Sequence, residues 1–119
     1  MKEAMMFSMH ALEADPKGLF DLFLKEAGAK LVFEMTGKKK VGDPSRLSAE
    51  EIMRIQYSYC AFSILAEENG KESAKRWLRR GNIFLKSPTK AFRRWPVSKL
   101  YVAMSRVMDC YKASRGILP

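Results

Sequence analysis

The sequence predicts an all-α fold, a compact bundle of about six helices, two of them short, around one long central helix over residues 49–69. Apolar residues recur mainly at helical spacing, and no segment has the strict alternation of a half-buried strand. Capping residues and glycines divide the chain into helix-sized pieces. We expect one helical domain over residues 1–119, with N-terminal helices and a basic loop in residues 1–45 and a second region in residues 46–119.

The N-terminal part predicts two helical stretches. Residues 3–14 carry apolar side chains at a loose helical spacing. A second stretch begins with Asp15 as N-cap and Pro16 at the first helical position. Gly28 is expected to bend or divide this stretch, and Gly37 to end it. Its apolar residues lie broadly on one side: Leu19, Leu22, Phe23, Leu31 and Met35.

The central helix follows a basic loop over residues 38–46. Ser48 and Glu51 form a capping box, in which each side chain bonds the backbone N–H of the other residue. The helix is expected to run to about Asn69, with Gly70 as a left-handed cap. Its wide apolar surface predicts a central position, covered on two sides. The residues of this surface are Ile52, Met53, Ile55, Tyr57, Tyr59, Cys60, Phe62, Ile64 and Ala66.

Two short helices are expected next. The first covers residues 72–80 and ends at Gly81. Ser87 and Pro88 are expected to cap the second, which ends near Arg94. In the first helix the residues expected to face inward are Ala74, Trp77 and Leu78, and those expected to face outward are Lys75, Arg76, Arg79 and Arg80.

The last helix is expected after a break at Trp95, because the following Pro96 disfavours helical backbone there. Ser98 opens this helix, which runs over residues 99–114 and is closed by Gly116. The residues expected to pack inward are Leu100, Met104, Val107, Met108 and Tyr111.

No common catalytic or phosphate-binding motif occurs in the sequence. The single histidine, His10, lies in an apolar helical stretch, where a structural or surface role is expected. Cys60 and Cys110 lack the spacing of a zinc site, and buried free thiols in a reducing cytoplasm are favoured over a disulfide. No apolar run approaches the ~20 residues that cross a bilayer. We predict a cytoplasmic protein that is not an enzyme, binds no membrane and needs no metal or cofactor.

Positive charge is concentrated in the C-terminal part of the chain. The net charge is +9, but residues 1–70 hold nine Lys and Arg against eleven Asp and Glu, and residues 71–119 hold thirteen against two. This asymmetry indicates an acidic partner. Two interpretations stay open: the cations bind nucleic-acid phosphates, with Trp77 or Trp95 stacking on a base, or Arg and Trp anchor a protein interface.

An ordered set of motifs lies in residues 46–88. "RLSAEE" opens the central helix, and "LAEENGKESA" contains its acidic, glycine-bearing end. The positions that follow are Ala74, Trp77, Leu78, Asn82, Leu85, Ser87 and Pro88. In this order the set resembles the C-terminal toxin-binding domain of Xre/MbcA/ParS-type antitoxins, although the connector before Ser-Pro is about two residues shorter than in that family.

The resemblance implies an antitoxin of a bacterial toxin–antitoxin system. Such a protein covers the active site of a toxin enzyme, typically of the RES-domain class that consumes NAD, and often binds its own operator DNA. Residues 46–119 would then be the toxin-binding region, and "GAKLVFEMTGKKKVGDPS" resembles a shortened helix-turn-helix. The basic "KAFRRWPVSK" departs from the C-terminal end of the family. The alternative hypothesis is a helical regulator that binds nucleic acid through its basic C-terminal half.

These hypotheses assign three sets of residues. The partner-binding residues are Arg76, Arg79, Arg80, Lys86, Arg93, Arg94, Arg106 and Arg115. The structural motif comprises Ser48, Glu51, Ala74, Trp77, Leu78, Asn82, Leu85 and Pro88, with Asn82 expected to hydrogen-bond exposed backbone groups. The alternative nucleic-acid set is Lys38, Lys39, Lys40, Lys90, Arg93 and Arg94. Besides a toxin, DNA and a second copy of this chain are candidate partners.

Overall fold

The computed structural model describes residues 15–81, 87–106 and 109, and this part of the chain is helical without a β-strand. The all-α prediction is confirmed. The expected helix over residues 3–14 and the C-terminal half of the last helix lie outside the described residues. The elements are α2 Pro16–Ala27, α3 Ala29–Thr36, the 3-10 turn η1 Pro44–Arg46, α4 Ala49–Asn69, α5 Lys71–Arg80, α6 Pro88–Arg94 and the 3-10 turn η2 Val97–Lys99, followed by helical residues 100–106.

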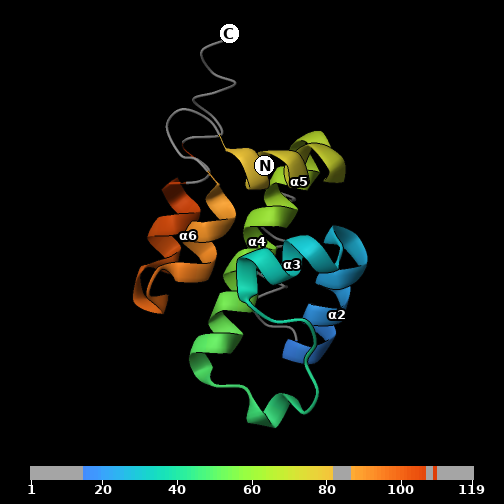
Figure 1. The fold of residues 1–119 in the computed structure, drawn as a ribbon, viewed down its shortest axis with the longest axis vertical. Helices are drawn as coiled ribbons and strands as arrows, with labels where there is room; N and C mark the ends of the chain where they lie inside the picture. Colours follow the sequence, from blue (N-terminus) through green and yellow to red (C-terminus); the bar gives the residue numbers. More distant parts are fainter. Residues whose placement is uncertain (1–14, 82–86, 107–108, 110–119) are drawn as a thin grey trace, which may run out of the picture.

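The central position of α4 is confirmed. In Figure 1, α2 lies on one side of α4, α6 and residues 100–106 lie on the other, α3 crosses in front of α4 and packs against both α2 and α6, and α5 crosses the C-terminal end of α4. The predicted capping box starts the helix: the backbone N–H of Glu51 donates to Ser48 Oγ over 3.1 Å, and the N–H of Ser48 donates to Glu51 Oε1 over 2.9 Å. Local sequence alone therefore defines where this helix begins.

The core is centred on aromatic side chains between α2 and α4. Phe23, Tyr59 and Phe62 are fully buried, with the rings of Phe23 and Tyr59 in an edge-on contact at 5.5 Å. The Tyr59 hydroxyl donates to Glu26 Oε1 over 3.0 Å, so its burial costs little. Burial, with the nearby Glu26 charge, raises the pKa of Tyr59 well above its ordinary value, and the hydroxyl stays a donor.

Single glycines connect successive helices. Gly28 separates α2 from α3 with φ 88° and ψ 152°, so the predicted second stretch is divided at this residue. Gly37 ends α3 as predicted, and the structure shows it in the left-handed conformation, with φ 75° and ψ 9°. Gly70 also has a positive φ, 89°, but its ψ of 159° is extended, so the predicted left-handed helical cap is wrong there. The reason is that α5 begins at the next residue, and an extended turn redirects the chain into it.

Of two predicted helix starts, that of α6 at Ser87 and Pro88 is confirmed and that of the last helix at Ser98 is wrong. Ser87 precedes α6 with φ 49° and ψ 65° and makes no side-chain cap bond. Its carbonyl instead accepts the N–H of Lys90 over 2.9 Å, and Pro88 supplies the first helical φ. Ser98 lies inside η2 rather than at a cap, because the turn already begins after Pro96, whose carbonyl accepts the N–H of Lys99 over 2.8 Å.

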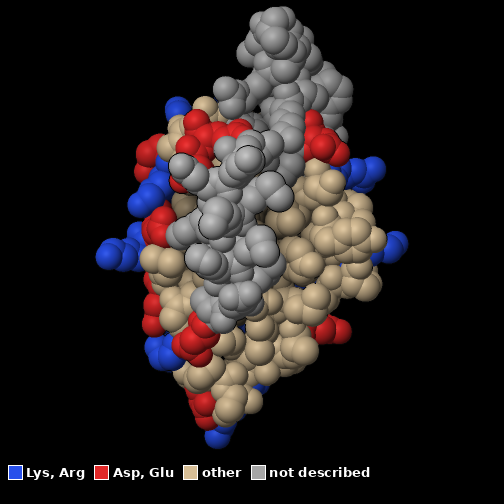
Figure 2. All heavy atoms as spheres, turned by 180° about the vertical axis from the view of Figure 1, so that it is seen from behind, with Lys and Arg blue, Asp and Glu red and all other residues tan. Residues whose placement is uncertain are grey.

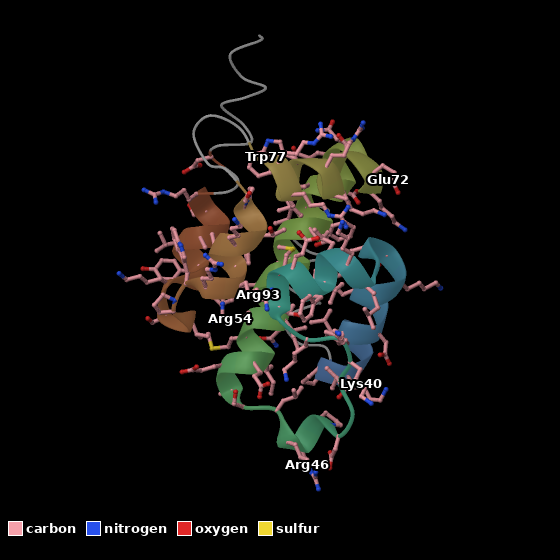
Figure 3. The ribbon with its side chains drawn as sticks, in the orientation of Figure 1. Lys40, Arg46, Arg54, Glu72, Trp77 and Arg93 are labelled. Carbon is pink, nitrogen blue, oxygen red and sulfur yellow. The ribbon has the colours of Figure 1, made fainter. Side chains whose placement is uncertain are left out.

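Arg54 on α4 holds the end of α6. Its Nη1 donates to the carbonyl of Phe92 and its Nη2 to the carbonyl of Trp95 over 2.9 Å (Figure 3). These are carbonyls at the C-terminus of α6, which have no partner within the helix. Partial burial lowers the pKa of Arg54, and the charge of Glu50 opposes this shift. The guanidinium group therefore fixes α6 and the corner after it against α4.

We predict that Arg54→Met lowers the free energy of unfolding by about 2 kcal/mol, because two carbonyls lose a charged donor. Urea denaturation followed by circular dichroism measures this. Arg46→Met is the matched control, since Arg46 is exposed at the end of η1 and should change stability by less than ~0.5 kcal/mol. Equal stability of the two variants would contradict this role of Arg54.

Gly28→Ala should cost about 1–3 kcal/mol, because the positive φ strains any residue that has a Cβ. The cost comes from the backbone alone, since a Cβ at Gly28 would meet nothing within 4 Å. Gly42→Ala is the control: a Cβ there also meets nothing within 4 Å, and φ of Gly42 is not positive. Thermal unfolding of both variants measures the difference, and a wild-type stability for Gly28→Ala would refute the strain.

Candidate functional site

Two basic segments distant in sequence meet at one aromatic ring. The guanidinium of Arg93 on α6 lies 4.7 Å from the ring centroid of Phe33 on α3, and Lys39 Nζ lies 5.6 Å from the same centroid. Both contacts have cation–π geometry. Figure 3 shows Arg93 where α6 meets the end of α3. The half-buried Phe33 thus joins the basic loop to the basic helix.

A shallow hollow of about 330 Å³ lies beside this ring. It is lined by Glu34, Thr89, Lys90, Arg93 and Arg94. The three cations are exposed, whereas Thr89 is almost fully buried. We call the group formed by these residues with Phe33 and Lys39 the α3–α6 surface. Its excess of positive charge suits an anionic group of a partner.

The carboxylate of this surface already has a partner. Glu34 Oε1 accepts from Arg79 Nε over 3.2 Å, with both side chains about one-third exposed. This ion pair links α5 to α3. Because Glu34 is paired with Arg79, its charge offsets the remaining cations of the α3–α6 surface less than a lone carboxylate would.

The predicted partner-binding residues fall into separate groups. Arg79, Arg93 and Arg94 are connected through α3 and α6 as described above. Arg76 and Arg80 are exposed on α5. The guanidinium of Arg106 instead lies 5.8 Å from the ring of Trp95. Two members lie outside the described residues: Lys86 and Arg115.

The alternative nucleic-acid set is only partly brought together. Lys39, Lys90, Arg93 and Arg94 belong to the α3–α6 surface. Lys38 pairs with Glu51 at the start of α4, which neutralises its charge. Lys40 is exposed and lies apart from Arg93, on the loop that follows α3 (Figure 3).

The structural-motif residues occupy packing positions where they are described. Ala74 and Leu78 are buried, and Trp77 packs partly buried against the core, as the inward side of α5 predicts. Pro88 is buried at the start of α6. Asn82 and Leu85 lie outside the described residues, so the scaffold role expected of Asn82 stays a prediction.

The opposite face of the molecule differs in charge. Figure 2 shows that Lys and Arg lie mainly at the edges of its described part, and that a broad area is uncharged.

Within residues 15–81, 87–106 and 109, no group of three His, Cys, Asp or Glu could hold a metal ion. In the same part of the chain no helix combines the length and apolarity that a bilayer crossing requires.

Sequence reasoning missed the residues that organise these contacts: Phe33, Glu34, Arg54 and Thr89. Phe33 and Glu34 contact residues more than 40 positions away, so no local pattern indicates their roles. Arg54 was detectable only as a charged side chain in an otherwise apolar part of the central helix. That signal indicates a buried partner without identifying it.

No family model, curated protein or solved structure matches the chain. The resemblance to antitoxins therefore rests on the ordered motif residues alone. The function has to be argued from the geometry of the described surfaces.

The Lys38–Glu51 pair predicts a pH dependence of stability. Hydrogen bonding by Lys38, with the Ser48 N–H, lowers the pKa of Glu51 below its ordinary 4.5. A carboxylate whose pKa is lower in the folded than in the unfolded state stabilises the fold at pH values above its unfolded-state pKa. This stabilisation is lost as the pH falls through its folded-state pKa. The free energy of unfolding of the wild type should therefore decrease in acid as Glu51 becomes protonated. Glu51→Gln lacks this titration, so its decrease should be smaller by at most about 1 kcal/mol, because the pair is partly exposed.

Urea denaturation at neutral and at acidic pH measures this difference for wild type and Glu51→Gln. Glu67→Gln removes an exposed carboxylate from the same helix and controls for the loss of one negative charge. An identical pH dependence in wild type and Glu51→Gln would show that the pair does not stabilise the fold.

Proposed function

We propose that this chain is a non-catalytic, antitoxin-like module that binds and neutralises a partner toxin enzyme. The observation that carries the proposal is the gathering of Lys39, Lys90, Arg93 and Arg94 around α3, on a hollowed surface built from two distant basic segments. The resemblance of residues 46–88 to antitoxins adds the class of partner, an enzyme of the RES-domain type.

Inhibition would follow from charge and position. Arg binds carboxylates through paired N–H donors, so the cations of the α3–α6 surface would pair with acidic residues of the toxin at the rim of its active site and block access for NAD. Because Arg93 and Lys90 are exposed on a helix rather than on a long loop, their backbone loses little conformational freedom on docking. Complementary charge would raise the association rate and fix the orientation of the complex.

Nucleic-acid binding is the second candidate, and one observation favours it. Lys39 lies over the same ring as Arg93, so the basic loop extends the basic helix along one surface. A series of phosphate contacts of this kind predicts an affinity that falls steeply with salt. The pairing of Lys38 with Glu51 reduces the number of cations that the loop can offer.

The test is co-purification with the product of the adjacent reading frame. Lys90→Glu with Arg93→Glu should weaken that complex at least about tenfold, since each reversal turns attraction into repulsion. Lys25→Glu with Lys30→Glu is the matched control, because these exposed lysines flank Gly28, outside the α3–α6 surface, and should leave the affinity unchanged. Undiminished binding by the first double variant would refute docking through this surface.

A mobility-shift assay with the upstream DNA separates the two functions. A shift that disappears at higher salt and in the Lys90→Glu, Arg93→Glu variant would favour nucleic acid. The absence of a shift at low salt would remove that alternative.

A further inference from the structure

A second hollow, of about 550 Å³, lies on the other side of Arg94, between the start of α4 and the corner that joins α6 to η2. We call it the Trp95 groove. Its lining residues are Glu50, Met53, Arg54, Arg94, Trp95, Pro96, Val97 and Ser98. The Trp95 groove shares Arg94 with the hollow of the α3–α6 surface. The proposed docking through the α3–α6 surface uses none of the other residues of the groove.

The groove has an apolar centre. Met53, Trp95 and Val97 are half-buried, and Pro96 is exposed beside them. Trp and Arg are the residues that most often dominate binding at protein interfaces, and methionine adapts to irregular apolar partners. An aliphatic or aromatic side chain of a partner would cover the apolar area that the corner leaves accessible.

The backbone around Trp95 is held in place. Arg54 Nη2 donates to the carbonyl of Trp95 over 2.9 Å, and the N–H of Trp95 donates to the carbonyl of Ala91 over 3.0 Å. Both polar groups of this residue's backbone are therefore bonded, and the side chain projects from a fixed corner. Such preorganisation reduces the ordering cost of binding.

Positive charge surrounds the apolar centre. Arg94 is exposed at the rim and makes no ion pair within the described part of the chain. Arg106 adds a guanidinium 5.8 Å from the Trp95 ring. Arg54 is a third cation, and its Nη atoms bond backbone carbonyls. Among the residues that line the groove, only Glu50 carries a negative charge. The groove thus complements an acidic ligand that also has an apolar side chain.

We infer that the Trp95 groove binds a short peptide segment of a protein partner, in which an aliphatic or aromatic residue lies next to Asp or Glu. The apolar side chain packs on Trp95 and Met53, and the carboxylate pairs with Arg94. This inference rests on the proposed function in so far as the partner is a protein. A nucleic-acid base could stack on Trp95, but the aliphatic lining of Met53 and Val97 favours a peptide, which can offer an aliphatic side chain.

The test begins with a display library of random short peptides, selected against the immobilised full chain. Enriched peptides are expected to combine Asp or Glu with an adjacent apolar residue. Their affinities are then measured by titration calorimetry. Trp95→Ala should weaken binding at least about tenfold, as loss of an aromatic anchor does. Tyr101→Ala is the matched control, since Tyr101 is 60% exposed and does not line the groove.

A second pair of variants tests the charge. Arg94→Glu should weaken acidic peptides at least about tenfold, because it places like charges together. Lys99→Glu makes the same charge change at an exposed position that does not line the groove, and should leave binding unchanged. Circular dichroism checks folding, and Arg94→Glu decides the question if Trp95→Ala fails to fold, because Arg94 is an exposed side chain.

The inference is overturned if no peptide is enriched, if the enriched peptides lack the acidic and apolar pair, or if folded Trp95→Ala and Arg94→Glu bind as wild type does. These outcomes are distinct from failure of docking through the α3–α6 surface. Lys90→Glu with Arg93→Glu leaves Trp95, Met53 and Arg94 in place, so it should retain peptide binding.

Discussion

The fold depends on the burial of α4 around its whole circumference. Six consecutive residues, 58–63, are buried, and six consecutive positions of an α-helix point in all directions. No single neighbour can cover such a helix, so α2 and α3, α5, and α6 each pack against a different part of it. The hydrophobic effect thereby sets the arrangement of the short helices, which are too short to be stable alone.

Polar contacts then orient these short helices more finely than apolar packing can. Arg54 bonds the end of α6, and Glu34 bonds Arg79 of α5, so α4 and α3 each hold a neighbour through a charged group. Their geometry is directional, whereas apolar contact is not. The proposed binding surfaces lie next to these bonds, so the backbone that carries their exposed cations is held in a fixed position.

The features predicted correctly from sequence are those that local chemistry determines. The capping box of Ser48 and Glu51, the break at Gly28 and the end of α3 at Gly37 depend on residues within a few positions. The position of Ser98 was predicted wrongly, because the same residue types that cap helices also occur in turns. The two carbonyls that accept from Arg54 are 38 and 41 positions away, so the sequence around Arg54 identifies neither of them, and the ends of the Trp95 groove could not be predicted.

The one-residue connections between helices restrict how the chain length can vary. An extra residue beside Gly28 would rotate α3 by about 100° about its axis, since successive helical residues are separated by roughly that angle. Phe33 and Glu34 would then leave Arg93 and Arg79. The same applies at Gly70, between α4 and α5. Within residues 15–81, insertions, deletions or a fused tag are therefore best accommodated in the segment 38–47, which connects α3 to α4 through η1.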